Sequence, residues 1–144
     1  MIRRYQHVGI TVSDLERSVA FYRDALGFTP AETSEGSGEE ISRALGLENV
    51  RVRLATVVRN DCLLELIEFA SPEGSKKAPR PCDLGCMHIA LEVDDIHRMY
   101  ETLSARGVKC NTPPQRNPES LSWAWWFYLS DPDGVPIELV QIQP

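Results

Sequence analysis

Apolar and polar residues alternate in four short stretches of the chain, two in each half. They are Gln6 to Ile10, Leu64 to Leu66, Met87 to Leu91 and Ile137 to Leu139. Successive side chains of a β-strand point to opposite faces of its sheet. Each stretch is therefore predicted to be a strand with one polar side chain on the face away from its main apolar residues. These polar residues are His7, Glu65, His88 and Glu138.

The apolar spacing becomes helical after the first strand. Residues spaced as on one helix face are Leu15, Val19, Tyr22 and Leu26. This spacing predicts a helix over about residues 14–26, with Ser13 to Glu16 as a capping box at its start. A second strand is expected at 28–33, a loop at 34–46 that could include a helical turn at 40–45, and a hairpin of strands at 51–58 and 62–69.

The same order of elements begins again after residues 71–84, a segment with three prolines that is predicted to be a linker. A strand is expected at 87–93, followed by a helix that begins after Asp94 and Asp95. A short strand at 108–111 and a loop at 112–120 come next. The last two strands, at 121–130 and 135–142, are predicted to form a hairpin around Asp131 to Gly134.

The two halves of the chain align with each other. His7 to Leu15 matches His88 to Ile96 without a gap, and Leu64 to Ile67 matches Ile137 to Val140. The repeat predicts an α+β fold of two βαβββ modules in tandem, at 5–70 and 85–142, within a single domain over 1–144. It places each histidine on the first strand of a module and each glutamate on the last.

Composition narrows the classes of partner. The chain is 42% hydrophobic and 25% charged, which is ordinary for a soluble globular protein. Its net charge of -6 argues against a nucleic-acid surface, because phosphates are bound by clustered Lys and Arg. No apolar run approaches the roughly 20 residues of a membrane span, and the start lacks the apolar core of a signal peptide. We expect a cytoplasmic protein with a small-molecule substrate, no nucleic-acid or membrane partner, and cysteines that are free thiols.

Two imidazoles and two carboxylates are a suitable donor set for one divalent metal ion. The set fits Zn, Ni, Co, Mn or Fe. A lone strand histidine is more often a surface or core residue, but a His and a Glu at matching positions of both halves favour metal binding. Fe(II) oxygenases typically use two histidines and one carboxylate. A fourth protein ligand therefore favours Lewis-acid chemistry over oxygen activation.

Three motifs make the chain resemble the vicinal oxygen chelate superfamily, which includes glyoxalase I, methylmalonyl-CoA epimerase, extradiol dioxygenases and the bleomycin and fosfomycin resistance proteins. They are H-V-G-I-x-V-x-D-L-x-x-S-x-x-F-Y-x-x-x-L-G-F from His7, H-I-A-L-E-V-D-D-I from His88, and D-P-D-G-x-x-I-E-L-V from Asp131. The resemblance implies that two βαβββ modules curl into an eight-stranded cup around one metal ion, and that the protein is a homodimer. The implied ligands are His7, Glu65, His88 and Glu138.

The predicted function is a metal-dependent isomerase or lyase, closest in kind to methylmalonyl-CoA epimerase or glyoxalase I. It would act on a small carbonyl or thioester substrate through a metal-chelated enolate or enediolate. Glu138 or Glu65 could act as the base by partial release from the metal, as the family's isomerases and lyases imply. Glu48 is a further candidate, because Leu47 to Val50 is similar to the E-Q-G-V segment of the CoA epimerases; a solvated loop carboxylate is the alternative.

Two other functions stay open. The first is an extradiol-type dioxygenase that uses Fe(II) with His7, His88 and Glu138; the second is a ligand-sequestering resistance protein. Trp123, Trp125 and Phe127 alternate with Ala124, Trp126 and Tyr128. One face of this strand is expected to line an apolar pocket and the other to meet a helix. Arg51 and Arg53 could hold an anionic substrate group or form a solvated edge.

Overall fold

The structure of the protein is a computed structural model that describes residues 1–118 and 123–142. The chain divides into two compact units, Met1–Lys77 and Ala78–Pro144. Each unit is a βαβββ module with one four-stranded sheet, so the predicted α+β fold with an internal repeat is confirmed. None of the described helices has the length and apolar character needed to span a membrane.

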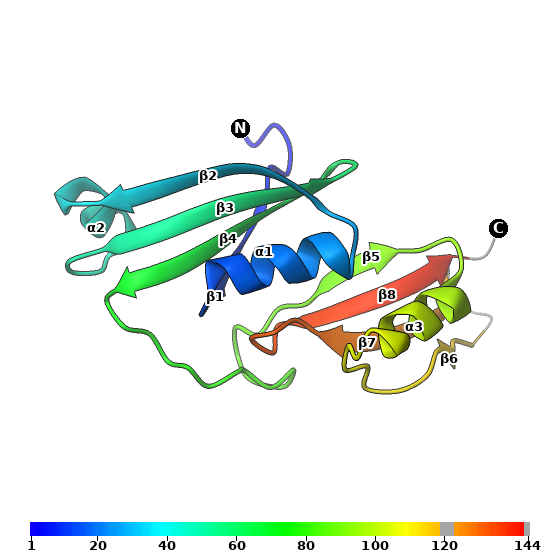
Figure 1. The fold of residues 1–144 in the computed structure, drawn as a ribbon. Coiled ribbons are helices and arrows are strands. Elements are labelled where there is room, and N and C mark those ends of the chain that lie inside the picture. The colour runs from blue at the N-terminus through cyan, green and yellow to red at the C-terminus, as the bar shows by residue number, and fades with distance from the viewer. Residues whose placement is uncertain (119–122, 143–144) are drawn as a thin grey trace. The chain divides into compact units, whose positions relative to one another are not determined.

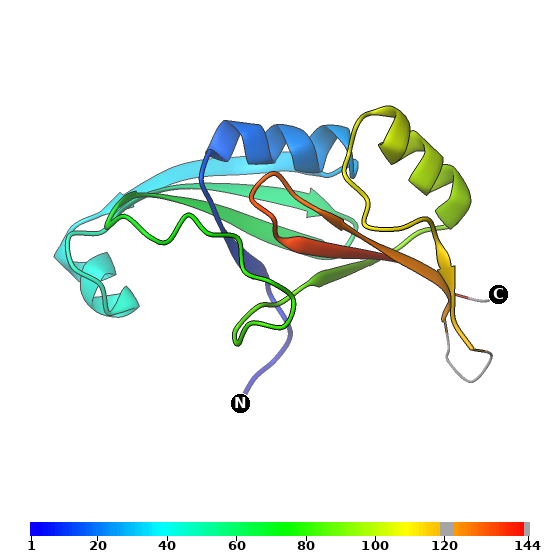
Figure 2. The same ribbon diagram turned by 90° about the horizontal axis from the view of Figure 1, so that it is seen from below.

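Unit 1 has the sheet order β1-β4-β3-β2, in which β1 runs parallel to β4 and the other pairs are antiparallel. Helix α1 lies across one face of this sheet, and α2 follows the end of β2 (Figures 1 and 2). The elements are β1 (Val8–Val12), α1 (Leu15–Asp24), β2 (Thr29–Ser37), α2 (Glu39–Leu45), β3 (Arg51–Arg59) and β4 (Cys62–Ser71).

The core of unit 1 lies between α1 and the sheet. Leu64 and Leu66 of β4 are 1% and 0% exposed, and the ring of Tyr22 from α1 is fully buried. Tyr22 packs edge-on against Phe28 at a centroid distance of 5.8 Å. The alternation predicted for β4 is therefore present, because Glu65, between the two leucines, is on the opposite face from α1.

Three details of unit 1 differ from the sequence predictions. Helix α2 has seven residues, where a loop with a helical turn was expected. Strand β2 continues to Ser37, where a loop was expected, because it pairs with β3 from Glu32 opposite Thr56 up to Ser37 opposite Arg51. The predicted capping box is wrong. Asp14 is the N-cap of α1 and accepts a hydrogen bond from the Arg17 amide at 2.8 Å, while Glu16 instead hydrogen-bonds Arg53 of β3.

Unit 2 repeats the topology, with the sheet order β5-β8-β7-β6 and β5 parallel to β8. The strand expected at 108–111 is reduced to a single bridge between Cys110 and Leu129, and a two-residue strand stands in the expected loop. Residues 119–122, part of the expected loop and of the next strand, lie outside the described residues. The elements are β5 (Ile89–Glu92), α3 (Ile96–Ala105), β6 (Gln115–Arg116), β7 (Trp123–Ser130) and β8 (Pro136–Ile142).

In each unit, a side chain from the last strand in sequence, β4 or β8, accepts a hydrogen bond from the first residue of the helix. Glu68 Oε2 of β4 accepts a hydrogen bond from the Leu15 amide at 2.9 Å, and Gln141 Oε1 of β8 accepts one from the Ile96 amide at 3.0 Å. Glu68 stands three residues after Glu65, as Gln141 stands three residues after Glu138. An odd spacing on a strand separates the faces. The helix contact thus fixes the face on which each candidate ligand lies, since a one-residue slip would exchange them.

Candidate metal centre

Each unit brings its own histidine and glutamate together. His7 Nε2 lies 3.7 Å from Glu65 Oε2, and His88 Nε2 lies 3.3 Å from Glu138 Oε2. Both histidines directly precede the first strand of their sheet, and both glutamates lie on the last strand, its parallel neighbour. The two units therefore build the same pair by the same route.

The two pairs suit a transition-metal ion. Bonds of about 2.1 Å to nitrogen and oxygen place two ligand atoms of one ion about 3.0 Å apart at a right angle and about 3.4 Å apart at the tetrahedral angle. The separations of 3.3 and 3.7 Å need shifts of only a few tenths of an ångström. Over the described residues, neither unit gathers three or more His, Cys, Asp or Glu side chains. One unit by itself therefore offers two ligands.

The surroundings of His7 leave the correct nitrogen free for a metal. Its Nδ1 is hydrogen-bonded to the side-chain oxygen of Gln6. An amide oxygen only accepts, so in the neutral ring Nδ1 carries the proton and Nε2, which faces Glu65, keeps its lone pair. Outer partners of this kind fix the tautomer of metal-binding histidines.

Tyr128 is a residue of this site that the sequence interpretation did not single out. It lies directly opposite Glu138 in the β7–β8 register, and its ring packs edge-on against His88 at 5.5 Å and 70°. Burial raises the pKa of the Tyr128 phenol, and the charge of Glu138 and a hydrogen bond with it raise that pKa further. The signal for this contact was the hairpin itself, because counting outward from the turn pairs 128 with 138.

The structure assigns the two faces of β7. Trp125 and Phe127 pack edge-on against rings of α3, at 4.8 and 5.5 Å, so they belong to the helix-facing core. Trp126 contacts Tyr128 at 5.8 Å and lies with it on the Glu138 face. The aromatic wall beside the candidate ligands is thus made by the second set of the predicted alternation. The side chains of Trp123 and Ala124 lie outside the described residues.

Glu48 lies away from Glu65 within unit 1. It lines a pocket of about 740 Å³, together with Arg43, Arg51 and Ser71, where β2, α2 and β3 meet. Ser71 stands six residues after Glu65 on β4. At about 3.3 Å per strand residue this is about 20 Å along the strand. The structure does not bring Glu48 and Glu65 together in this unit, and a role for Glu48 as a base stays a prediction.

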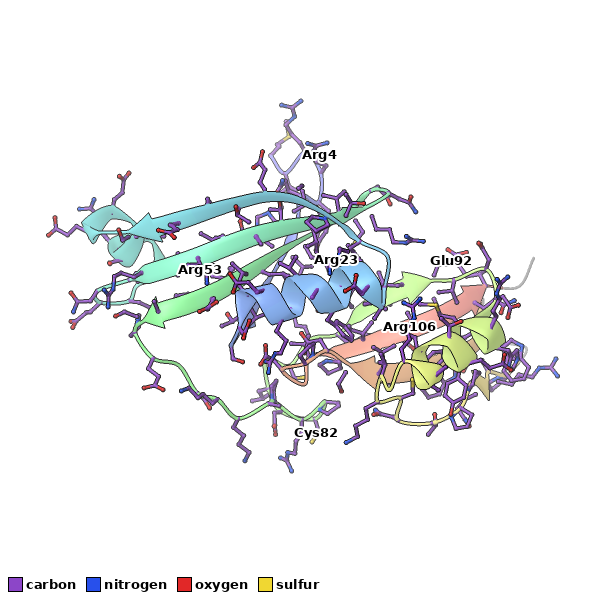
Figure 3. The ribbon with its side chains drawn as sticks, viewed as in Figure 1. Arg4, Arg23, Arg53, Cys82, Glu92 and Arg106 are labelled. Atoms are coloured by element: carbon purple, nitrogen blue, oxygen red, sulfur yellow. The ribbon has the colours of Figure 1, made fainter. Side chains whose placement is uncertain are left out.

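Arg53, labelled on β3 in Figure 3, contacts two carboxylates of its own unit. It is hydrogen-bonded to Glu16 of α1, and its Nη1 lies 3.5 Å from Glu68 Oε2. This hydrogen bond lowers the pKa of Glu16. Arg53 therefore links α1 to the sheet. Arg51, the other arginine considered for an anionic substrate group, lines the same pocket as Glu48.

A family model described as the Glyoxalase/Bleomycin resistance protein/Dioxygenase superfamily matches residues 4–139. The chain belongs to this superfamily. A 2-epi-5-epi-valiolone epimerase from an Actinomyces species is 29% identical over 142 residues, which cover 94% of this chain and 78% of the relative. A lactoylglutathione lyase from Haemophilus influenzae is 28% identical over 136 residues, with coverages of 94% and 90%. The relatives of this chain thus include proteins named as an epimerase and as a lyase.

The fold agrees with solved members of the superfamily. A glyoxalase family protein from Bacillus cereus has a TM-score of 0.85 and 22% sequence identity, and the match covers 100% of this chain and 97% of the other. At that identity the likeness shows the fold alone. The resemblance inferred from the three sequence motifs is therefore confirmed at the level of family and fold.

Proposed function

We propose that the protein is a metal-dependent isomerase or lyase that moves a proton at a carbon next to a carbonyl or thioester group. The proposal assigns one His–Glu pair from each unit to a centre for one divalent ion, because the pairs occupy equivalent positions of a duplicated module. The observation that carries it is the approach of a histidine nitrogen to a glutamate oxygen in both units, at 3.7 and 3.3 Å. Relatives named as an epimerase and a lyase favour this reaction class.

The donor set decides which ions are suitable. Imidazole nitrogen and carboxylate oxygen suit Zn, Ni, Co, Mn and Fe. When bound, such an ion supplies Lewis-acid polarisation of neighbouring substrate oxygens, which stabilises the charge that develops as the proton leaves.

The residues of the chain supply the remaining steps. The histidines provide nitrogen donors, and their side chains are 40% and 49% exposed, so a small ligand can reach them. A glutamate oxygen takes the proton from the substrate carbon and returns it to a carbon of the same molecule, which requires only hydrogen-bond reach. Trp126 and Tyr128 form an aromatic wall on the Glu138 face, where an apolar part of the substrate can pack.

Solvent exchange at the substrate carbon tests this function. The metal-loaded protein is incubated in deuterated water with an α-branched acyl-thioester or with a hemithioacetal, and loss of the proton is followed by NMR. We expect exchange with the native protein and its loss after chelation or in Glu65→Gln and Glu138→Gln. Glu68→Gln is the matched control, because it makes the same change on the opposite face of β4.

Two results would overturn the proposal. One is a fully metal-loaded protein that exchanges no proton on either class of substrate. The other is oxygen uptake with a catechol under Fe(II) without proton exchange, which would favour the extradiol dioxygenase.

A further inference from the structure

We propose that Tyr128 is a positioning residue that holds the Glu138 carboxylate, so that the two glutamates of the proposed centre have different tasks. Glu138 is the fixed ligand, and Glu65 is the carboxylate free to move toward the substrate as the base. The inference rests on the proposed function and deepens it, since it chooses between the two candidate bases.

The first observation is the contact between Tyr128 and Glu138. The two residues face each other across the antiparallel β7–β8 pair, and residues directly opposite share a face of the sheet. The phenol is hydrogen-bonded to the carboxylate. In this contact the phenolic O–H is the donor and a carboxylate oxygen is the acceptor.

The second observation is that the tyrosine ring is itself held. It packs edge-on against the rings of His88 and Trp126, at centroid distances of 5.5 and 5.8 Å. Edge-to-face ring pairs are favourable beyond their buried area. The hydroxyl is therefore presented to Glu138 from a fixed ring, and the same ring supports the second ligand of the unit, His88.

The third observation is that the glutamate of unit 1 has a threonine opposite it instead of a tyrosine. Thr56 takes the place of Tyr128, directly opposite Glu65 in the β3–β4 register, and its hydroxyl accepts a hydrogen bond from the Glu32 amide at 3.2 Å. Within residues 1–118 and 123–142, the side chain of Glu65 has a polar contact only with His7. The Glu65 side chain is also more exposed than that of Glu138, at 28% against 14%.

These differences set the tasks of the two carboxylates. A carboxylate that accepts a hydrogen bond from a rigid phenol loses that bond when it moves, whereas Glu65 has no such bond to lose. Glu138 is therefore suited to stay with the ion, and Glu65 to exchange between the ion and the substrate proton.

Cobalt binding to the metal-free protein tests the inference without an activity assay. Tyr128→Phe removes the hydroxyl and keeps the ring, and Thr56→Val is the matched control in unit 1. Loss of an outer-shell partner typically weakens metal binding about 10- to 100-fold. We expect a loss of this size in Tyr128→Phe, measured by Co²⁺ absorption, and an unchanged affinity in Thr56→Val. Equal affinity of Tyr128→Phe and the native protein would overturn the inference.

A double-mutant cycle in the metal-free protein separates this inference from the proposed function. Tyr128→Phe, Glu138→Gln and the double variant are unfolded in urea and followed by tryptophan fluorescence. Coupling between the residues predicts that the two single midpoint shifts do not add up to the double shift. Additive shifts would overturn positioning by Tyr128. A native protein that binds no Co²⁺ but shows coupling would overturn the proposed function and support the Tyr128–Glu138 contact.

Discussion

Asp131 stabilises the turn between β7 and β8, the strands that carry Tyr128 and Glu138. The residue is 5% exposed. Its Oδ1 accepts hydrogen bonds from the Asp133 amide at 2.9 Å and from the Val135 amide at 2.8 Å. Asp131→Ala removes the acceptor of both bonds and leaves two partly buried amides without it.

The expected cost follows from these two bonds. A hydrogen bond to a charged group contributes about 1.5–3 kcal/mol. Water can reach loop amides in part, so we expect Asp131→Ala to lower the free energy of unfolding by about 2–4 kcal/mol rather than by the full sum. Asp131→Asn keeps an oxygen acceptor of the same shape and is expected to lose about half as much.

Urea unfolding followed by tryptophan fluorescence measures this loss in the correct unit. All three tryptophans of the chain lie in β7, so their signal reports on unit 2. A loss below about 0.5 kcal/mol in Asp131→Ala, the range of ordinary surface substitutions, would refute the role of these bonds. Equal losses in the alanine and asparagine variants would show that the side-chain oxygen is not the stabilising group.

Three further substitutions or reactions test other parts of the structure. The Ser18 hydroxyl is buried without a hydrogen-bond partner among the described residues, so Ser18→Ala should raise the free energy of unfolding by about 1 kcal/mol. A lower midpoint in thermal unfolding would contradict this. Glu68→Leu removes the acceptor for the Leu15 amide and should cost about 1 kcal/mol in urea unfolding, whereas Glu68→Gln should cost less. Equal costs would refute the capping role. Burial raises the pKa of the Cys62 thiol, so at neutral pH it should react with an aromatic disulfide more slowly than the exposed Cys82 (Figure 3), and the difference should narrow as the pH rises. Equal rates at neutral pH would contradict the burial of Cys62.

The repeat made most of the fold predictable, and the exceptions have physical causes. Strands β1, β4 and β8 alternate between the two faces of a sheet, so their apolar pattern identifies them. Strand β2 has no such pattern, because every residue except Gly36 is exposed and backbone pairing with β3 holds it. The cap of α1 was predicted wrongly because two neighbouring residues of the sequence are suitable for it. Ser13 and Asp14 can both cap a helix, and the backbone conformation selects Asp14.

Strand alternation predicts which face of its sheet each candidate ligand occupies. Alternation and the repeat placed Glu65 and Glu138 on the face away from the helices, and each histidine lies beside its glutamate. Tyr128 was missed, although the hairpin predicted around the β7–β8 turn already places it opposite Glu138. The place of Glu48 depends on how α2 and the following loop fold, which no periodic pattern encodes.

The stoichiometry of metal binding is the most direct test of the proposed centre. The native protein is stripped by chelation and titrated calorimetrically with Zn²⁺ or Co²⁺, in parallel with His7→Ala and His88→Ala. We predict one ion per chain in the native protein and a loss of tight binding in each variant, because each unit supplies one His–Glu pair. Tight binding that survives both substitutions, or a native protein that binds neither ion, would contradict a centre built from the two pairs.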